Sequence, residues 1–206
     1  MPQAARRAPN PRGQGGHLRE EIVRAAARLL EESGGAGVTL RAVARTAGIT
    51  APSIYAHFAD LNDVLQAVVD NTFHALTTHI RHAVDGITDP VDRLHSAIRA
   101  YVDFGLQQPH QYRVLFTVPP ADRREQLDKD METMTGADAF AFLLDGIRDC
   151  VSAGRSRSQD PEVDATALWL ALHGYVGTRS TLHDFPWPAD DKLLDTLVRN
   201  LAQLTG

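Results

Sequence analysis

The chain of 206 residues is 43% hydrophobic and 23% charged, with a formal net charge of -5. This length and composition suit a globular protein with a buried core, in one large domain or two small ones. The single cysteine, Cys150, excludes a disulfide or a cysteine-based zinc site within one chain. We expect it to be a small buried side chain in a reducing cytosol rather than a catalytic thiol. No apolar stretch is long enough to span a bilayer, so we expect a cytoplasmic protein without a membrane partner.

The N-terminal part of the chain is basic and the remainder is acidic. Residues 1–59 carry eight Arg and four Glu, a net charge of +4, whereas residues 60–206 carry 13 basic and 22 acidic residues, a net charge of -9. A local positive face is enough to attract DNA. Residues 1–16 hold Pro, Gly and Arg without an apolar run, so we expect a disordered tail. Its arginines can enter a DNA minor groove as a basic arm, or the segment is a solvated tail or a cloning remnant.

Two helical patterns follow the tail. A first helix is predicted over residues 17–33 by an apolar stripe: Ile22, Ala26, Leu29 and Leu30. A second is predicted by residues at the same kind of spacing: Leu40, Val43, Ala44 and Ala47. Thr39 can cap this second helix with its hydroxyl group. Gly48 can supply the left-handed residue that ends it, and Ile49 is expected to be an apolar plug before the next helix.

A third short helix is predicted to have Thr50 as its cap and Pro52 in its first turn, where the missing N–H does no harm. Ile54 and Phe58, four residues apart, are expected to face inward. The residues then left facing outward are Thr50, Ala51, Ser53, Tyr55, Ala56 and His57. Small and hydroxyl-bearing side chains at the start of an exposed helix suit a DNA major groove, and Tyr55 and His57 can hydrogen-bond phosphate oxygens. The pattern predicts a helix-turn-helix.

These residues carry a family resemblance. The order Thr39-Leu40-Arg41-x-Val43-Ala44-x-x-Ala47-Gly48-Ile49, then Ser53-Ile54-Tyr55-x-His57-Phe58, Asp60 and Leu65, resembles the N-terminal domain of TetR-family transcriptional regulators. The resemblance implies double-stranded DNA as a partner, contacted by Thr39, Arg41, Thr50, Ala51, Pro52, Ser53, Tyr55 and His57. Such proteins commonly carry a Lys where this chain has Leu61, so affinity is expected to depend more on Arg41, Tyr55 and His57. The alternative is a helical hairpin with no nucleic-acid role.

A long helix is predicted after the helix-turn-helix. Asp60 and Asp63 resemble a capping box. The apolar stripe that follows reaches about residue 85: Leu61, Leu65, Val68, Val69, Leu76, Ile80 and Val84. This helix is long enough to join the DNA-binding domain to a second domain and to act as a lever between them. Three histidines lie along it, His74, His79 and His82, but no carboxylate or Cys completes a metal site, so we expect a solvated face and neither metal nor cofactor.

The rest of the chain predicts five more helices, so the fold is expected to be all-α with about nine helices. Asp89-Pro90 and Asp160-Pro161 each resemble an N-cap followed by Pro at the first helical position, and Thr135 with Asp138 resembles another capping box. Three parts are expected: a disordered basic tail over residues 1–16, a helix-turn-helix DNA-binding domain over 17–60, and a helical ligand-binding and dimerisation domain over 61–206.

The last two predicted helices have more apolar surface than one core needs. In the first, residues 161–185, Gly174 and Gly177 would let a second helix approach closely. The last helix carries a wide apolar stripe: Leu193, Leu194, Leu197, Val198, Leu201 and Leu204. In TetR-like proteins the last two helices form a four-helix bundle across a two-fold axis. The resemblance therefore implies a homodimer, and a homodimer implies a palindromic operator.

Aromatic residues gather in the helices of the second domain, where few polar groups are available to orient a ligand. We expect an effector pocket lined by Phe104, Tyr112, Phe116, Phe140, Leu143, Trp169 and His173. The orders Trp169-x-x-x-His173-Gly174 and Pro109-x-x-Tyr112-x-x-x-Phe116 resemble the ligand domain of one TetR subgroup. The alternative is that these aromatic residues fill a core and that His173 donates to a carbonyl.

No sequence pattern assembles a nucleophile with its base, so we do not expect an enzyme. Gly154-Arg-Ser-Arg-Ser lacks the last Gly of a nucleophile elbow, and Gly13-Gln-Gly15-Gly16 lacks a preceding strand and a Walker lysine. We predict a homodimeric bacterial repressor that a small amphipathic or aromatic molecule releases from DNA. A ligand-independent or activating regulator and a helical small-molecule carrier are the alternatives.

Overall fold

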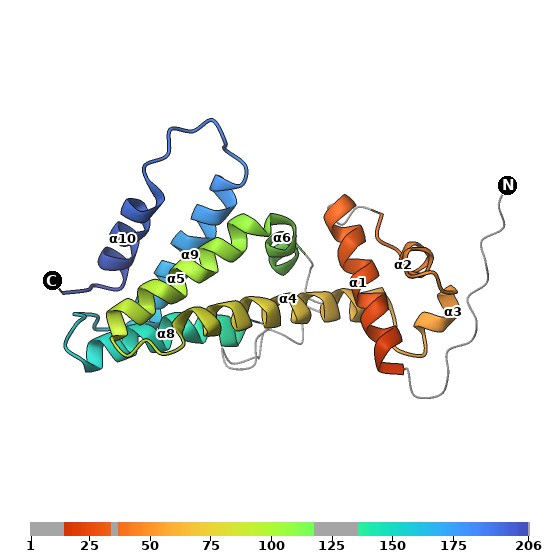
Figure 1. Cartoon of the computed structure of the whole chain (residues 1–206), viewed down its shortest axis with the longest axis horizontal. Coiled ribbons are helices and arrows are strands. Elements are labelled where there is room, and N and C mark those ends of the chain that lie inside the picture. The colour runs from red at the N-terminus through yellow and green to blue at the C-terminus, as the bar shows by residue number, and fades with distance from the viewer. Residues whose placement is uncertain (1–14, 34–36, 118–135, 206) are drawn as a thin grey trace. The chain divides into compact units, whose positions relative to one another are not determined.

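The structure, a computed structural model, describes residues 15–33, 37–117 and 136–205. The predicted tail before residue 15 and the predicted capping residue Thr135 lie outside the described residues. Among the described residues all regular elements are helices, which confirms the all-α class (Figure 1). Their bounds are α1 Gly15–Ser33, α2 Leu40–Ala47, α3 Ala51–Ile54, α4 Leu61–Val84, α5 Pro90–Gln107, α6 Pro109–Thr117, α8 Ala137–Ser152, α9 Pro161–Arg179 and α10 Asp190–Leu201. None of these described helices has the length and apolar character needed to cross a membrane.

Contacts divide the chain into two compact units. The head unit comprises Met1–Thr72 and Arg113–Glu125, and the body unit comprises Phe73–Tyr112 and Gln126–Gly206. The division therefore falls inside α4 and inside α6. The predicted boundary between residues 60 and 61 lies at the start of α4, and the roles assigned to the two sides of it remain predictions.

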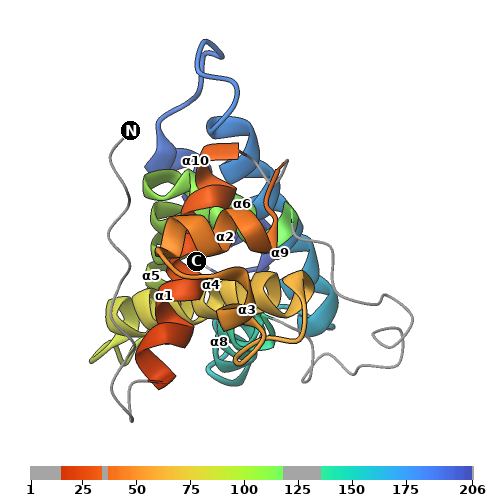
Figure 2. The same cartoon turned by 90° about the vertical axis from the view of Figure 1, so that its right-hand side faces the viewer.

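The head unit forms where the apolar faces of its short helices meet. Ile22 and Val23 of α1, Val43 of α2 and Ile54 of α3 are each at most 2% exposed. The α2 helix packs against both α1 and α3 (Figure 2). Because each helix is apolar on one side only, burying these residues leaves the opposite sides to solvent.

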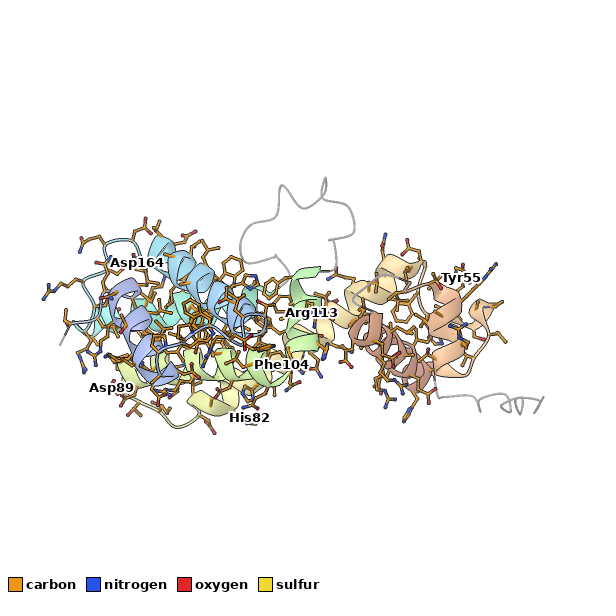
Figure 3. The ribbon with its side chains drawn as sticks, turned by 90° about the horizontal axis from the view of Figure 1, so that it is seen from above. Tyr55, His82, Asp89, Phe104, Arg113 and Asp164 are labelled. Atoms are coloured by element: carbon orange, nitrogen blue, oxygen red, sulfur yellow. The ribbon has the colours of Figure 1, made fainter. Side chains whose placement is uncertain are left out.

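The predicted cap of α4 is present. The Asp63 N–H donates to Asp60 Oδ1 at 3.0 Å, and the Ala59 N–H donates to Asp63 Oδ2 at 2.9 Å. These two bonds satisfy backbone donors that a helix start leaves without partners. Farther along α4, His74, His79 and His82 are all exposed, and His82 is labelled in Figure 3.

In the body unit, α5 packs against α8, α9 and α10, and α9 also contacts α8 and α10 (Figure 1). Leucine and isoleucine side chains fill the space between these helices, each at most 1% exposed: Leu94, Ile98, Ile147, Leu168 and Leu172. Two predicted caps are confirmed, because Asp89 accepts from the N–H groups of Val91 and Asp92, and Asp160 accepts from that of Val163. Cys150 is fully buried, and this burial raises the pKa of its thiol to about 11.

In the body unit, two predicted helix ends are wrong. The α9 helix stops at Arg179 rather than at residue 185. Near this end, side-chain hydroxyl groups donate to backbone carbonyls four residues earlier and so compete with the helical backbone bonds: Thr178, Ser180 and Thr181. The N-cap of α8 is Gly136, which makes no side-chain capping bond. Leu204 lies beyond the end of α10, in an isolated bridge with Ser156.

The backbone at Gly105 is closely packed against the side chain of Val176. A Cβ atom built there lies 2.5 Å from Cγ1 of Val176, whereas one built at Gly146 lies 2.9 Å from Cδ1 of Leu94. The Val176 side chain is β-branched and stiff, but Cδ1 is the flexible end of Leu94. We expect Gly105→Ala to lower the free energy of unfolding by about 1 to 3 kcal/mol, and Gly146→Ala to lower it by less. Urea denaturation measures both values, and an equal or smaller loss for Gly105→Ala would contradict the tight contact.

Candidate functional site

The turn of the helix-turn-helix has the predicted geometry. Thr39 has extended backbone angles, and its Oγ1 accepts from the N–H of Ala42 at 3.1 Å. Gly48 has a φ of 68°, in the left-handed region, and ends α2. The Ile49 N–H then donates to the Ala44 carbonyl at 2.9 Å. These bonds close the end of α2 and redirect the chain toward α3.

The helix that follows the turn is shorter than predicted. It ends at Ile54 instead of continuing to Phe58, and the Ile54 carbonyl accepts from the N–H groups of both His57 and Phe58. The inward placement of Ile54 and Phe58 is confirmed, since they are 0% and 5% exposed. Thr50 occupies the N-cap position but makes no side-chain capping bond. Its hydroxyl is instead bonded to that of Ser53, with 2.8 Å between the oxygens.

The residues predicted to contact DNA are all at least partly accessible to solvent. Those exposed to solvent are Thr39, Arg41, Thr50, Pro52 and Tyr55, and those that are half-buried are Ala51, Ser53 and His57. Tyr55 is 61% exposed and projects from the head unit (Figure 3). Their accessibility is compatible with DNA contact, and their individual roles stay predictions.

Arg19 of α1 is a further charged residue at the motif, and the sequence pattern did not indicate it. Its Cζ atom lies 4.9 Å from the centroid of the Phe58 ring. A guanidinium group over an aromatic face is attracted to the ring, so the positive charge is held beside the end of the helix-turn-helix. Arg19 is far from Phe58 in the sequence, and only the packing of α1 brings the two residues together.

In the body unit, three residues of the predicted effector site come together. The Tyr112 hydroxyl lies 2.8 Å from His173 Nδ1, and the ring of Trp169 is stacked on that of His173 at a centroid distance of 5.9 Å. Tyr101 joins them, because its hydroxyl lies 2.7 Å from that of Tyr112. The spacing of Tyr101 marks it only as a buried residue of α5, so its place in this tyrosine–histidine cluster was missed.

The cluster is neutral at pH 7. Burial raises the pKa of Tyr101 to about 12, against the lowering effect of its hydrogen bonds to Tyr112 and Trp169. Burial also raises the pKa of Tyr112, and the neighbouring Tyr101 adds to the shift. The pKa of His173 is lowered from 6.5, because burial disfavours the charged imidazolium. An uncharged chain of two buried hydroxyl groups and one half-buried imidazole therefore links α5, α6 and α9.

The other predicted lining residues differ in how far they are buried. Phe104 and Leu143 are buried in the body unit at 2% and 5% exposure, with the ring of Phe104 6.2 Å from that of His79. Phe140 is half-buried on α8. Phe116 is 39% exposed and belongs to the part of α6 assigned to the head unit. The structure thus supports a compact group of Tyr101, Tyr112, Trp169 and His173, and the wider pocket stays a prediction.

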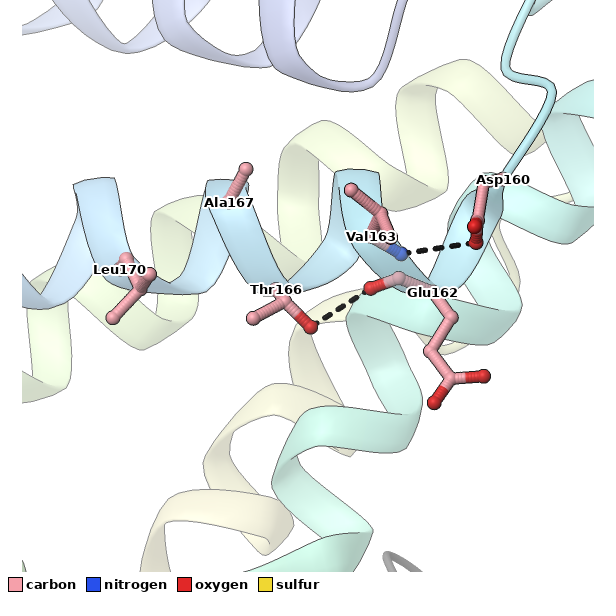
Figure 4. A pocket seen from close by; sticks show the side chains of 6 residues that line it. All are labelled: Asp160, Glu162, Val163, Thr166, Ala167 and Leu170. Atoms are coloured by element: carbon pink, nitrogen blue, oxygen red, sulfur yellow. Dashed lines mark hydrogen bonds between the residues drawn. The ribbon is translucent and has the colours of Figure 1, made fainter.

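Two surface hollows lie elsewhere on the body unit. A groove of about 530 Å³ follows α9 and is lined by Asp160, Glu162, Val163, Thr166, Ala167 and Leu170 (Figure 4). A cleft of about 280 Å³ lies among the end of α4, α5 and α8, with apolar residues flanked by Arg81, Arg93 and Asp138. The groove on α9 is partly apolar, and Val163 and Leu170 within it are 60% and 57% exposed.

The fold and the motif define a helix-turn-helix protein with a separate helical body. Residues 22–68 match the family model described as "Bacterial regulatory proteins, tetR family", and residues 94–201 match the one described as "Tetracyclin repressor-like, C-terminal domain". The second match covers 108 of the 206 residues. The chain therefore belongs to the TetR family.

Individual relatives agree with this assignment. The chain is 32% identical over 143 residues to the HTH-type transcriptional regulator HbdR of Aromatoleum sp. (strain CIB), a match over 68% of this chain and 60% of that protein. It is 28% identical over 98 residues to the HTH-type transcriptional activator FasR of Mycolicibacterium smegmatis, over 48% of this chain and 45% of that protein. The chain thus spans about half of the length of these curated relatives.

A solved structure shares the fold. A protein of unknown function from Rhodococcus sp. RHA1 superposes with a TM-score of 0.76, over 94% of this chain and all of that one, at 23% identity. At this level of identity the likeness shows the fold alone. The resemblance of Trp169, His173 and Gly174 to one subgroup stays a prediction.

Proposed function

We propose that this protein is a homodimeric transcriptional repressor that binds a palindromic DNA operator and is released from it by a small amphipathic or aromatic effector. The observation that carries the proposal is the helix-turn-helix: Thr39 caps α2, Gly48 turns the chain, and the outward residues between 50 and 57 stay accessible. Family membership supports the same conclusion. A chromosomal operator would place the protein in the cytoplasm.

In this proposal, residues of the motif divide into two groups. Thr50, Ala51 and Ser53 contact base edges in the major groove, because they are small and lie around the start of α3. Arg41, Tyr55 and His57 contact phosphates, together with Arg19. Phosphate contacts supply affinity and position, whereas base contacts supply sequence preference.

The exposed surface of α9 supports the proposed dimer. One set of its incompletely covered residues recurs at alternating steps of four and three: Val163, Ala167, Leu170, Gly174 and Gly177. Such steps form a continuous seam along one side of a helix. Cβ atoms built at Gly174 and Gly177 meet no neighbour within 4 Å, so the backbone of a second helix can approach there. Leu193, Leu197 and Leu201 of α10 are only half-buried and would extend the interface.

The tyrosine–histidine cluster supports an effector site in the body unit. Tyr112 and His173 can exchange their mutual hydrogen bond for bonds to a ligand, while Trp169 supplies an aromatic face. Because all groups of the cluster are neutral, it offers no charge to balance an ionised ligand. We therefore expect an uncharged aromatic or amphipathic molecule with at least one hydrogen-bonding group.

Activation of transcription is the second candidate, because FasR is named as an activator. The two modes share the same protein–DNA contacts and differ in the position of the operator relative to the promoter. Transcription measured in vitro from the promoter that carries the selected operator distinguishes repression from activation. Added protein lowers the transcript level if it is a repressor and raises it if it is an activator.

Selection of bound duplexes from a random library, followed by footprinting, tests DNA recognition. We expect an imperfect palindrome whose half-sites lie about one duplex turn or more apart.

Arg19→Gln should reduce the slope of log affinity against log salt by about 0.9, because one phosphate contact is lost. Arg24→Gln is the matched control, since Arg24 is exposed on the same helix and its Nε donates to the Glu20 carbonyl. Binding of DNA without sequence preference would contradict the proposed function. An unchanged salt slope for Arg19→Gln would show only that Arg19 is not one of the phosphate contacts.

A charge placed in the α9 seam tests the dimer. Leu170→Asp should convert the dimer into folded monomers and abolish tight operator binding, because Leu170 is 57% exposed and its replacement leaves the core intact. Light scattering measures the mass and circular dichroism the helix content. His82→Asp, at an exposed position of α4, adds the same group outside the seam and should leave the dimer unchanged. A dimeric Leu170→Asp protein would place the interface elsewhere.

Thermal stabilisation by small molecules tests the effector site. Uncharged aromatic alcohols should raise the Tm, and the corresponding carboxylates should not. The effect should be constant from pH 7 to 9, because the histidine pKa lies below this window and the Tyr101 pKa, at about 12, lies above it. His173→Ala and Trp169→Phe should keep operator binding and lose the stabilisation. If both variants respond like wild type, the effector binds at another place.

A further inference from the structure

The hydroxyl groups of Thr50 and Ser53 form a coupled pair on the outward side of the motif. Their oxygens lie 2.8 Å apart, Thr50 is exposed and Ser53 is half-buried. Thr50 makes no side-chain capping bond, and the Ser53 N–H is already bonded to the Thr50 carbonyl at 2.9 Å. Each hydroxyl thus has the other as its hydrogen-bond partner, and the two act on a ligand as one group.

After the hydrogen bond between them, the two hydroxyl groups still have a donor and acceptors that a base can use. Each hydroxyl has one proton to donate and two lone pairs. One proton is used inside the pair, whichever residue donates it, so the pair presents one outward donor with acceptor lone pairs beside it. Ala51 lies between the two residues in the sequence and has no polar side-chain group that could compete for the same base.

This set fits one base better than the others. In the major groove adenine presents the N7 acceptor next to the N6 donor, whereas guanine presents two acceptors, N7 and O6. Thymine presents one acceptor and a methyl group, and cytosine presents one donor. Among the four bases taken singly, only adenine matches both the donor and the acceptor of the pair. Guanine would need two donors, which requires the internal hydrogen bond to break.

We propose that Thr50 and Ser53 together recognise adenine, through its N7 and N6 groups, at one position of each operator half-site. The inference rests on the proposed function, because it requires the motif to enter a major groove. It names the base that this part of the motif selects. Recognition uses the two side-chain hydroxyls, and the backbone N–H groups of the four-residue α3 take no part in it.

The test measures the affinity of the full-length protein for duplexes that carry each base pair at each position of the selected half-site. At one position the wild type should prefer adenine to guanine by about five-fold, the effect of one net hydrogen bond. Thr50→Val and Ser53→Ala should each reduce this preference to below about two-fold. Because the hydroxyls act as a unit, the double variant should lose no more than either single variant.

Two further variants serve as controls. Thr50→Ser keeps both hydroxyl groups and should keep the preference for adenine. Thr46→Val removes an exposed hydroxyl of α2 in the same unit and should leave the preference unchanged. Thr50→Val and Ser53→Ala remove the pair independently, so one variant with wild-type helix content by circular dichroism is sufficient for the test.

The outcomes separate this inference from the proposed function. Wild-type protein that binds all duplexes equally overturns both. A wild-type preference that the two single variants leave unchanged overturns the inference alone. It is also overturned if guanine, cytosine or thymine is preferred at the affected position, or if the effects of the single variants add in the double variant.

Discussion

The direction of α3 depends on one backbone conformation, the positive φ of 68° at Gly48. Side chains with a Cβ atom rarely adopt this conformation, and glycine adopts it without strain. The Gly48 N–H bonds to the carbonyls of Ala44 and Arg45, and the left-handed φ turns the chain so that the N–H of Ile49 also bonds to the Ala44 carbonyl. With α2 closed in this way and Ile54 buried, the other residues from Thr50 to His57 stay wholly or partly exposed.

The two proposed binding surfaces differ in their physical character. The surface of the head unit is open, and its arginines and hydroxyl groups suit a hydrated, charged partner such as DNA. The cluster of Tyr101, Tyr112 and His173 is neutral and largely buried, so its hydrogen bonds are made in a medium that penalises unpaired polar groups. A ligand that binds there must replace the hydrogen bonds that it breaks. The choice of ligand is therefore restricted more by its hydrogen-bonding groups than by its size.

The α9 helix serves the interior and the proposed interface at once. Its inner face contributes Leu168 and Leu172 to the core, and the adjoining side carries Trp169 and His173. Its outer face carries Val163 and Leu170, which the single chain leaves uncovered. Effector site and dimer seam would therefore share one rigid element. A displacement of α9 at the cluster would be felt in the seam, because a helix moves as a unit.

The sequence by itself determined the features that depend on neighbours within about four residues. These include the all-α class, the caps at Thr39, Asp60, Asp89 and Asp160, and the left-handed end of α2 at Gly48. Each is a local hydrogen bond or backbone preference that a few residue types satisfy. The order of these local signals was also enough to indicate the family.

Only the tertiary structure decided which distant residues meet. Arg19 reaches Phe58 because α1 packs in the head unit, and Tyr101 reaches Tyr112 and His173 because α5, α6 and α9 converge. It also decided where α3 and α9 end, and that the Thr50 hydroxyl bonds to Ser53 rather than to the backbone. Helical spacing shows which side of a helix is apolar, but the partner of each side is selected by the packing of all the helices together.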